Sequence, residues 1–390
     1  MQTMNTQAPP TQDRVHILAT HHRGAVSSVE VVLPESAWMG SALDGMTPEA
    51  AVEHARTHAP ISSRAHAKAV ELACTAALGA PLPDRDESLA TERWLAAEVI
   101  DAHLHRLLLA WPTLLGFEPR HNRYTEFHRR LMHCADAETA SALGGDVLDL
   151  VARELLAGFF SRIRMPHGIG EFLDRLEAGG SLSSVMAALI GLGAANPAKG
   201  DKVPLLGTLS AAAWATSAGH WPAEDFMRQP TQGSVAAETG ALARHAASQL
   251  VKLLLDRGHR VSARLFARAI DLADCASRMR HPESEEVAPL IDATAPEPGI
   301  GLARVTGARG VLLCWAKVAD GLITDCVMVP PEAWNFHPEG PFCREAVSTL
   351  EHPEDEEACR KRLAMLALAL DPAREIEVEF TGKAPARKRK

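Results

Sequence analysis

Cysteine and histidine are the residues of this chain best suited to bind metals or act as nucleophiles, so their spacing decides which sites are available. There are seven cysteines and 18 histidines. The cysteines are scattered, without any CxxC pair, at positions 74, 134, 275, 314, 326, 343 and 359. This spacing excludes zinc ribbons, ferredoxin clusters and thioredoxin-type redox sites, because each needs closely spaced thiolates. An odd, scattered set also argues against a secreted disulfide framework and favours a reducing, cytoplasmic compartment.

The histidines show no metal-ligand spacing. His103 and His105 are two residues apart, so they cannot share one face of a helix. His128 and His133 are not four residues apart either. The chain lacks GxSxG and HExxH motifs, and its glycine pairs lack the strand-to-helix context of a nucleotide-binding loop. Local motifs therefore predict neither a resident metal nor catalytic residues.

Composition indicates a folded protein with a sizeable core. Of 390 residues, 46% are hydrophobic and 23% are charged, and the net charge of −9 argues against a nucleic-acid partner. Residues 1–13 are polar and contain proline, so we expect a disordered lead rather than a signal peptide. Two uncharged stretches, 181–198 and 203–223, are rich in alanine, glycine and serine. We expect them to form internal helices, with no membrane partner.

Hydrophobic periodicity changes along the chain. Residues 14–46 open with two β-branched runs around the sequence HHRG, which predict an antiparallel hairpin. Helical patterns dominate residues 47–280 and predict a helical core. Within this core, residues 236–255 are expected to form one helix.

In the last third of the chain the residue pattern changes, and it predicts an α+β part over residues 281–380. A proline- and acid-rich connection spans 281–299. Two β-branched runs at 310–329 flank an Asp-Gly pair, the strongest short signal for a hairpin. A helix with an acidic first turn is expected over 354–370.

These elements predict one structural unit over residues 14–380, followed by a basic tail at 381–390. The expected fold class is mainly α with small α+β parts, and short β-hairpins lie near both ends of the chain. Such chain ends often meet in space.

Residues 307–340 carry the most specific pattern in the chain. They follow, in order and nearly in spacing, three motifs of the nickel–iron hydrogenase large subunit: PRGxLxH, DGxI and PTxWNxxPR. The matching residues are Arg309, Gly310, Asp320, Gly321, Ile323, Pro330, Trp334, Asn335 and Pro338. The chain therefore resembles that large subunit, and the resemblance implies its fold around a helical core.

Both cysteine motifs of the resembling family have lost their thiols. The first aligns with residues 56–66, where Arg56 and His66 remain while Ala59 and Ser62 stand at the cysteine positions. The last motif, DPCxxCxxH, aligns with residues 371–379, where the cysteines are replaced by Ala373 and Ile376. Nickel and iron need thiolates there, so hydrogen turnover at this site is not expected.

In lacking these cysteines, the chain resembles the HupK/HoxV family. Its members are cysteine-poor relatives of the large subunit that are encoded with hydrogenase maturation factors. The resemblance implies a non-enzymatic, cytoplasmic scaffold that transiently carries an iron–dicyanide–carbonyl fragment. It also implies a HypC-type small chaperone as partner, and the hydrogenase large subunit as the acceptor. No stably bound cofactor is expected.

Three residues are candidate contacts for the iron fragment. In the family, the arginine matching Arg309 lies over the cyanide ligands, which suits a permanently charged guanidinium. Cys314 stands where the family has the histidine of PRGxLxH, and it could offer a thiolate with His66 as a neighbouring base or ligand. The alternatives stay open: Arg309 as an ordinary buried or paired arginine, and Cys314 as a small buried hydrophobe.

The family also links the two chain ends through magnesium, which is held by a glutamate and by the terminal histidine. Here the aligned positions carry Arg23 and Glu379. An acid and a base at these positions predict a direct Arg23–Glu379 ion pair in place of the metal.

Two functions from different classes fit these residues. The first is the assembly scaffold described above. The second is a degenerate large-subunit paralogue that binds protein partners in a structural or regulatory role and carries no metal fragment. Infrared bands of cyanide and carbon monoxide on the purified protein would distinguish them.

Overall fold

The computed structural model describes residues 14–34, 40–59, 61–134, 136–161, 164–193, 203–284, 288–347 and 354–381. The expected disordered lead, and all of the expected basic tail except its first residue, lie outside the described residues. Within the described residues, no helix has the length and apolar character needed to cross a membrane.

Helices form most of the described chain up to residue 280. They are α1 (Pro48–His58), α2 (Ser63–Ala77), α3 (Arg85–His105), α4 (Trp111–Leu115), α5 (His121–Met132), α6 (Ala137–Leu150), α7 (Ile169–Leu176), α8 (Ser181–Gly191), α9 (Ala211–Ala218), α10 (Glu224–Arg228), α11 (Ala241–His245), α12 (Gln249–Asp256) and α13 (Arg260–Arg280). Two π-helical turns, η3 (Arg106–Ala110) and η4 (Val151–Leu155), continue α3 and α6.

The strands form two sheets, and three further helices follow the second of them in the chain. A three-stranded sheet has the order β2-β1-β7, and a four-stranded antiparallel sheet has the order β3-β4-β5-β6. The elements are β1 (Val15–His22), β2 (Ala25–Val32), β3 (Ile291–Glu297), β4 (Ile300–Gly307), β5 (Gly310–Ala319), β6 (Leu322–Val329), α14 (Pro331–Asn335), α15 (Pro341–Ala346), α16 (Glu356–Leu370) and β7 (Ile376–Phe380).

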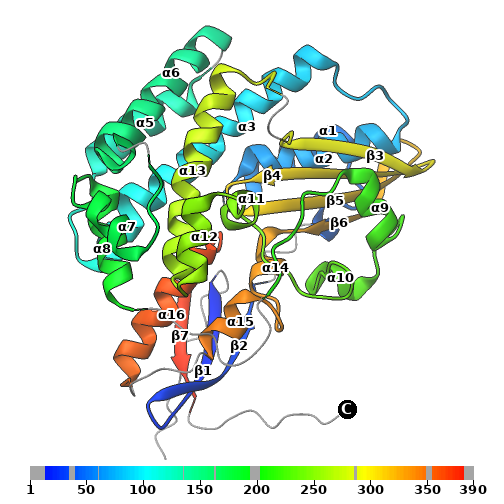
Figure 1. The fold of residues 1–390 in the computed structure, drawn as a ribbon. Helices are drawn as coiled ribbons and strands as arrows, with labels where there is room; N and C mark the ends of the chain where they lie inside the picture. The colour runs from blue at the N-terminus through cyan, green and yellow to red at the C-terminus, as the bar shows by residue number, and fades with distance from the viewer. Residues whose placement is uncertain are drawn as a thin grey trace, which may run out of the picture.

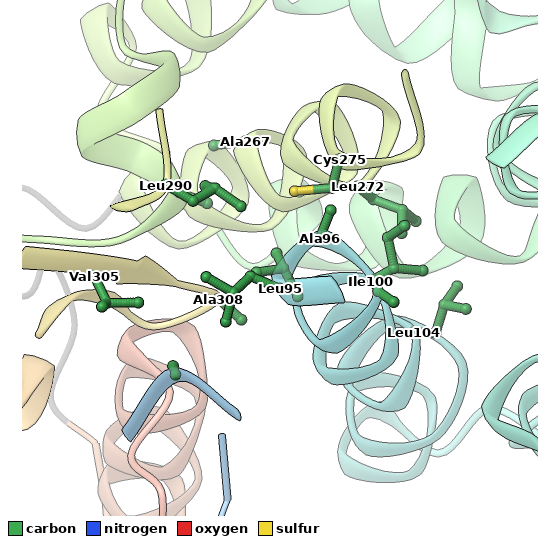
Figure 2. Packing of buried hydrophobic residues seen from close by; sticks show 14 of the residues in the cluster. Leu95, Ala96, Ile100, Leu104, Ala267, Leu272, Cys275, Leu290, Val305 and Ala308 are labelled. Carbon is green, nitrogen blue, oxygen red and sulfur yellow. The ribbon is translucent and has the colours of Figure 1, made fainter. Parts of the chain in front are cut away.

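The long helices α3 and α13 form the centre of the molecule (Figure 1). A capping box fixes the start of α3, because the Asp84 carboxylate accepts the Glu87 N–H and the Glu87 side chain accepts the Asp84 N–H. Figure 2 shows Ile100 of α3 beside Leu272 of α13, with Leu95 further along α3. All three are at most 1% exposed, so the two helices meet in a core from which water is excluded.

Helix α2 packs against one face of the four-stranded sheet, and α1 packs against α2 (Figure 1). Gly301 of β4 sits directly under α2: a Cβ there would lie 1.9 Å from the Ala73 carbonyl oxygen and 2.6 Å from the Ala77 nitrogen. Only a residue without a side chain permits this approach of helix and strand.

The substitution Gly301→Ala should therefore destabilise the fold by about 1–3 kcal/mol, because backbone atoms must separate. Gly145→Ala is the matched control. It lies inside α6 with no atom within 4 Å of the added methyl group, so a gain of about 0.5–1 kcal/mol is expected. Urea unfolding of both variants measures the difference. Equal stability of Gly301→Ala and the unmodified protein would contradict the close approach of β4 and α2.

The sheet contains one strand that periodicity missed. Residues 281–299 were expected to form a connection, but β3 occupies 291–297 and pairs antiparallel with β4. Proline and acidic residues are tolerated there because β3 is an edge strand, with hydrogen-bonded pairing on one side only.

Two expected helices are interrupted. The helix predicted over 236–255 is broken into α11 and α12, because Thr239 and Gly240 instead contact the turn between β4 and β5. The stretch 203–223 contains only α9 as an α-helix. Its first part runs extended beside Glu238, which exchanges backbone hydrogen bonds with Pro204 and Leu206.

The chain ends meet through β7, which pairs parallel with β1. The predicted Arg23–Glu379 ion pair is wrong: within the described residues, these two side chains form no ion pair. The register places Glu379 opposite Leu18, whereas Arg23 lies five residues further on, in the turn after β1. Five strand residues span about 16 Å.

Other charges connect the two ends. Arg14 lies 3.1 Å from Glu375, and the His16 ring lies 3.6 Å from the Glu377 carboxylate. The Arg14–Glu375 pair is largely exposed, so it contributes at most about 1 kcal/mol. The parallel β1–β7 hydrogen bonds are the main link between the ends.

Candidate functional site

A small cavity lies where four chain segments converge. Its volume is about 40 Å³, room for about three water molecules at 10–15 Å³ each. The start of α2 supplies Ser62 and His66, and the β4–β5 turn supplies Arg309. The remaining polar wall comes from Glu332 of α14 and from the segment after α16. The cavity therefore brings together residues more than 300 positions apart.

The start of α2 is held in a defined conformation. Ser62, at a lost cysteine position, adopts φ 62° and ψ 43°, which is the left-handed region. The Glu98 carboxylate of α3 accepts the backbone N–H groups of Arg64 and Ala65 at 2.8 and 3.1 Å. A carboxylate at a helix N-terminus satisfies free donors and complements the helix dipole. These contacts fix how Ser62 and His66 face the cavity.

His66 lines the cavity, and one of its two ring nitrogens is engaged in a hydrogen bond. Its Nδ1 lies 2.8 Å from the Ser62 carbonyl oxygen, so Nδ1 carries the proton and Nε2 keeps its lone pair. Burial lowers the pKa of His66; the Ser62 hydrogen bond and Glu332 oppose this, while Arg309 and Arg374 lower the pKa further. The imidazole is therefore neutral at pH 7 and can act as a ligand through Nε2.

Arg309 reaches across the cavity toward α2. The residue is only 6% exposed, and its Nη1 donates to the Ser62 hydroxyl at 2.7 Å. Its Nε is buried and has no hydrogen-bond partner among the described residues. A guanidinium with an unused donor inside a cavity is suited to an anionic ligand. Among the described residues, Arg309 forms no ion pair with a carboxylate, so the alternative of a paired arginine does not describe this geometry, whereas that of an ordinary buried arginine stays open.

Thr239 holds the turn that carries Arg309 in place. Gly310 has φ 131°, and a Cβ there would lie 2.4 Å from the Thr239 side chain. The Thr239 hydroxyl accepts the Val311 N–H at 3.0 Å. Only glycine fits this backbone conformation and this close contact. The broken helix described above is thus the element that fixes Arg309.

The segment after α16 is positioned by a buried ionic cluster. Asp371 is 1% exposed and accepts from Arg106 Nε at 2.6 Å and from Arg268 Nη1 at 2.5 Å. The Ala373 N–H then donates to the Glu332 carboxylate at 2.8 Å. These contacts place Ala373, at the second lost cysteine motif, in the cavity wall.

Cys314 does not reach the cavity lining. It is fully buried on β5, and its sulfur lies 3.9 Å from the sulfur of Cys326. The Cys326 hydrogen bond and burial raise the pKa of the Cys314 thiol well above its usual value. The prediction of a cavity thiolate is therefore wrong, and the small-hydrophobe alternative describes Cys314. All seven cysteines are free.

Several residues of the site went unrecognised in the sequence. Glu332 lies between Pro331 and Trp334, inside the quoted PTxWN-like motif, and Arg374 lies between the two lost cysteine positions. Motif order could have singled out both. Glu98 carried no local signal, because its partners lie 33 and 34 residues away. Arg56, retained in the first motif, lies outside this lining and pairs with Glu53.

The donor set does not fit a resident nickel ion. The lining offers one imidazole, one carboxylate, one hydroxyl and the thioether of Met328, but no thiolate. Across the described ranges, no group of three or more histidine, cysteine, aspartate or glutamate side chains could hold a metal ion. Two guanidinium groups, from Arg309 and Arg374, make the cavity favourable for an anion instead.

Three curated relatives share sequence with this chain, whereas no protein-family model matches it. HupK of Azotobacter vinelandii is 34% identical over 158 residues, 40% of each chain. HupK of Rhizobium leguminosarum bv. viciae is 28% identical over 88% of this chain and 90% of its own. HoxV of Cupriavidus necator is 27% identical over 82% and 84%. All three are named hydrogenase expression/formation proteins.

The fold is similar to solved hydrogenase structures. The [NiFeSe]-hydrogenase of Desulfomicrobium baculatum superposes with a TM-score of 0.60 over 90% of this chain and 94% of its own, at 15% identity. The [NiFeSe]-hydrogenase of Desulfovibrio vulgaris Hildenborough gives a TM-score of 0.57 at 17% identity, over the same shares of the two chains. At these identities the comparison establishes the fold alone. The chain is thus a homologue of the HupK/HoxV hydrogenase expression/formation proteins, built on the fold of the nickel–iron hydrogenase large subunit.

Proposed function

We propose that this protein is a non-enzymatic scaffold in the assembly of the nickel–iron hydrogenase active site. It holds an iron–dicyanide–carbonyl fragment transiently and passes it to the large subunit. The observation that carries the proposal is the Arg309 guanidinium, which is buried in a thiolate-free cavity and whose Nε has no hydrogen-bond partner in the described part of the chain. Cyanide ligands on iron carry negative charge and accept hydrogen bonds, which is the chemistry that Arg309 offers.

In this proposal, His66 and Arg309 hold the iron fragment. His66 Nε2 can donate its lone pair to iron, and Arg309 can donate hydrogen bonds to a cyanide nitrogen. The four thiol positions of the family motifs carry Ala59, Ser62, Ala373 and Ile376 in this chain, and of these Ser62 and Ala373 line the cavity. With no thiolate in the cavity, one imidazole is the single protein bond to iron in this proposal, so release to an acceptor is favoured.

Loading requires some movement of the cavity wall. An iron with three diatomic ligands is larger than the three waters that the empty cavity accommodates. Arg374 is only half-buried in this wall, so we expect the wall to open on this side. A HypC-type chaperone is the proposed donor of the fragment, and the hydrogenase large subunit is the proposed acceptor.

Infrared spectroscopy tests the proposal. The protein is purified after co-expression with the hydrogenase maturation machinery, and its spectrum is compared with that of protein expressed without the machinery. Two cyanide bands and one carbon monoxide band are expected only in the first sample. If a folded sample lacks all three bands, the structural or regulatory role replaces the scaffold role.

His66→Ala is expected to lower the iron content of protein purified in this way at least tenfold, because the only imidazole in the cavity lining is lost. His58→Ala is the matched control, since His58 is exposed at the end of α1. Iron is measured per folded protein by mass spectrometry. An unchanged iron content in His66→Ala would remove His66 from the proposed iron site without excluding Arg309.

A further inference from the structure

A second, larger cavity of about 270 Å³ lies between β4 and helices α11 and α13. Arg304 and Thr306 of β4 line one side of it, and His245 and Asp274 line the other. Neither the proposed function nor the sequence motifs use this cavity.

In the wall of this cavity, the Arg304 guanidinium has hydrogen-bond donors without a partner among the described residues. It is 3% exposed, and its Nη1 donates to the Pro289 carbonyl at 3.0 Å and to the Thr306 hydroxyl at 2.8 Å. Its Nε is buried without a partner, and its Nη2 makes no hydrogen bond to a described residue. Nε–H and Nη2–H lie on the same edge of the guanidinium, so this edge is an unused two-pronged donor.

The carboxylates near Arg304 are engaged elsewhere. Asp292, directly opposite Arg304 in the β3–β4 register, accepts the Ala211 N–H at 2.7 Å and thereby binds the start of α9. Within the described residues, no carboxylate lies within 4 Å of the Arg304 guanidinium. A buried charge without a partner is costly, and proteins normally pair it.

The other charges of the cavity neutralise one another. Asp271 is bound by Arg244 through two nitrogens and also by His103 and His245. Arg278, likewise in the wall, is paired with Glu92 at 2.6 Å. Asp274 is 41% exposed, with the His245 ring 3.6 Å away. The positive charge of Arg304 is thus the one in this wall that lacks a direct counter-charge among the described residues.

We propose that this cavity binds a small oxyanion, a carboxylate or phosphate headgroup, through the Nε–Nη2 edge of Arg304. The Thr306 hydroxyl accepts from Arg304 Nη1 and keeps its own proton to donate to the anion. His245 and Asp274 on the opposite wall favour a ligand whose other end carries hydrogen-bond donors. The volume suits a small metabolite rather than a nucleotide.

Calorimetric titration with inorganic phosphate and with acetate, at constant ionic strength, tests this site. Saturable binding of at least one anion is expected, and the stronger of the two identifies the headgroup class. Arg304→Gln should weaken that binding at least tenfold, and Arg304→Lys, which keeps the charge but loses the fork, should weaken it less. Arg153→Gln is the control, because Arg153 is exposed on η4, and it should bind like the unmodified protein.

Absence of saturable binding to the folded protein, or equal affinity in Arg304→Gln, overturns the proposal. If Arg304→Gln does not fold, a crystal soaked in selenate decides. An anomalous selenium peak within hydrogen-bond distance of Arg304 supports the site, and a cavity without such a peak overturns it.

Discussion

Replacing Arg309 with alanine is expected to abolish the cyanide and carbon monoxide bands of protein purified with the maturation machinery. The side chain is 6% exposed, points into the cavity, and supplies the positive charge that an anionic iron fragment needs. Loss of a charge-assisted hydrogen bond of this kind costs about 1.5–3 kcal/mol, or roughly a 10- to 150-fold loss of affinity. Arg309→Lys keeps the positive charge but loses the planar set of N–H donors, so an intermediate occupancy of the cavity by the iron fragment is expected.

Arg56→Gln is the control for this experiment. Arg56 belongs to the same family motif as His66, but it is exposed on α1 and lies outside the cavity lining. Its variant should keep full infrared intensity. Equal band intensity in folded Arg309→Ala and in Arg56→Gln would show that the cavity is not the binding site.

The largest loss of stability is expected for Asp371→Asn. The substitution leaves Arg106 and Arg268 facing a neutral amide in a buried site. Removing one partner of a buried ion pair costs about 3–5 kcal/mol, measured as the free energy of unfolding in urea. Glu375→Gln, which breaks the exposed pair with Arg14, should cost at most about 1 kcal/mol. Equal costs for the two variants would contradict the role of the buried cluster.

The same cluster predicts a pH dependence. Burial alone would raise the pKa of Asp371, but Arg106, Arg268 and Arg309 together hold it well below its usual range. A carboxylate with a depressed folded-state pKa stabilises the fold above its unfolded pKa of about 3.9 and loses this contribution as the pH falls further. The stability gap between the unmodified protein and Asp371→Asn should therefore be constant from pH 7 to about 5 and shrink below pH 4.

The residues of the cavity could be predicted from motif order because the fold brings the motifs together. Ser62, His66, Arg309 and Ala373 were aligned from three separate segments, and all four line one cavity. Motif position did not predict how deep each side chain lies. Cys314 lies on the same strand as the lining residue Leu312, two residues further along. At that position the side chain is buried in the core and does not reach the cavity.

Long-range pairing is the part that the sequence could not specify. The Arg23–Glu379 pair failed because a parallel register depends on tertiary packing and not on the local pattern of β1 or β7. The anchoring of α2 by Glu98 and the contact between His103 and Asp271, 168 residues apart, have no periodic or compositional signal. Edge strand β3 was missed because proline and acidic residues are typical of loops as well as of edges.

Transfer of a labelled fragment tests the proposed scaffold role most directly. The protein is loaded in cells supplied with iron-57 and with a carbon-13 source for cyanide, purified, and mixed with apo large subunit from an unlabelled strain. We expect the isotope-shifted cyanide bands and the iron-57 to leave this protein and to appear together on the large subunit. Maturation of the large subunit with unlabelled iron only, while the label stays behind, would contradict the scaffold role.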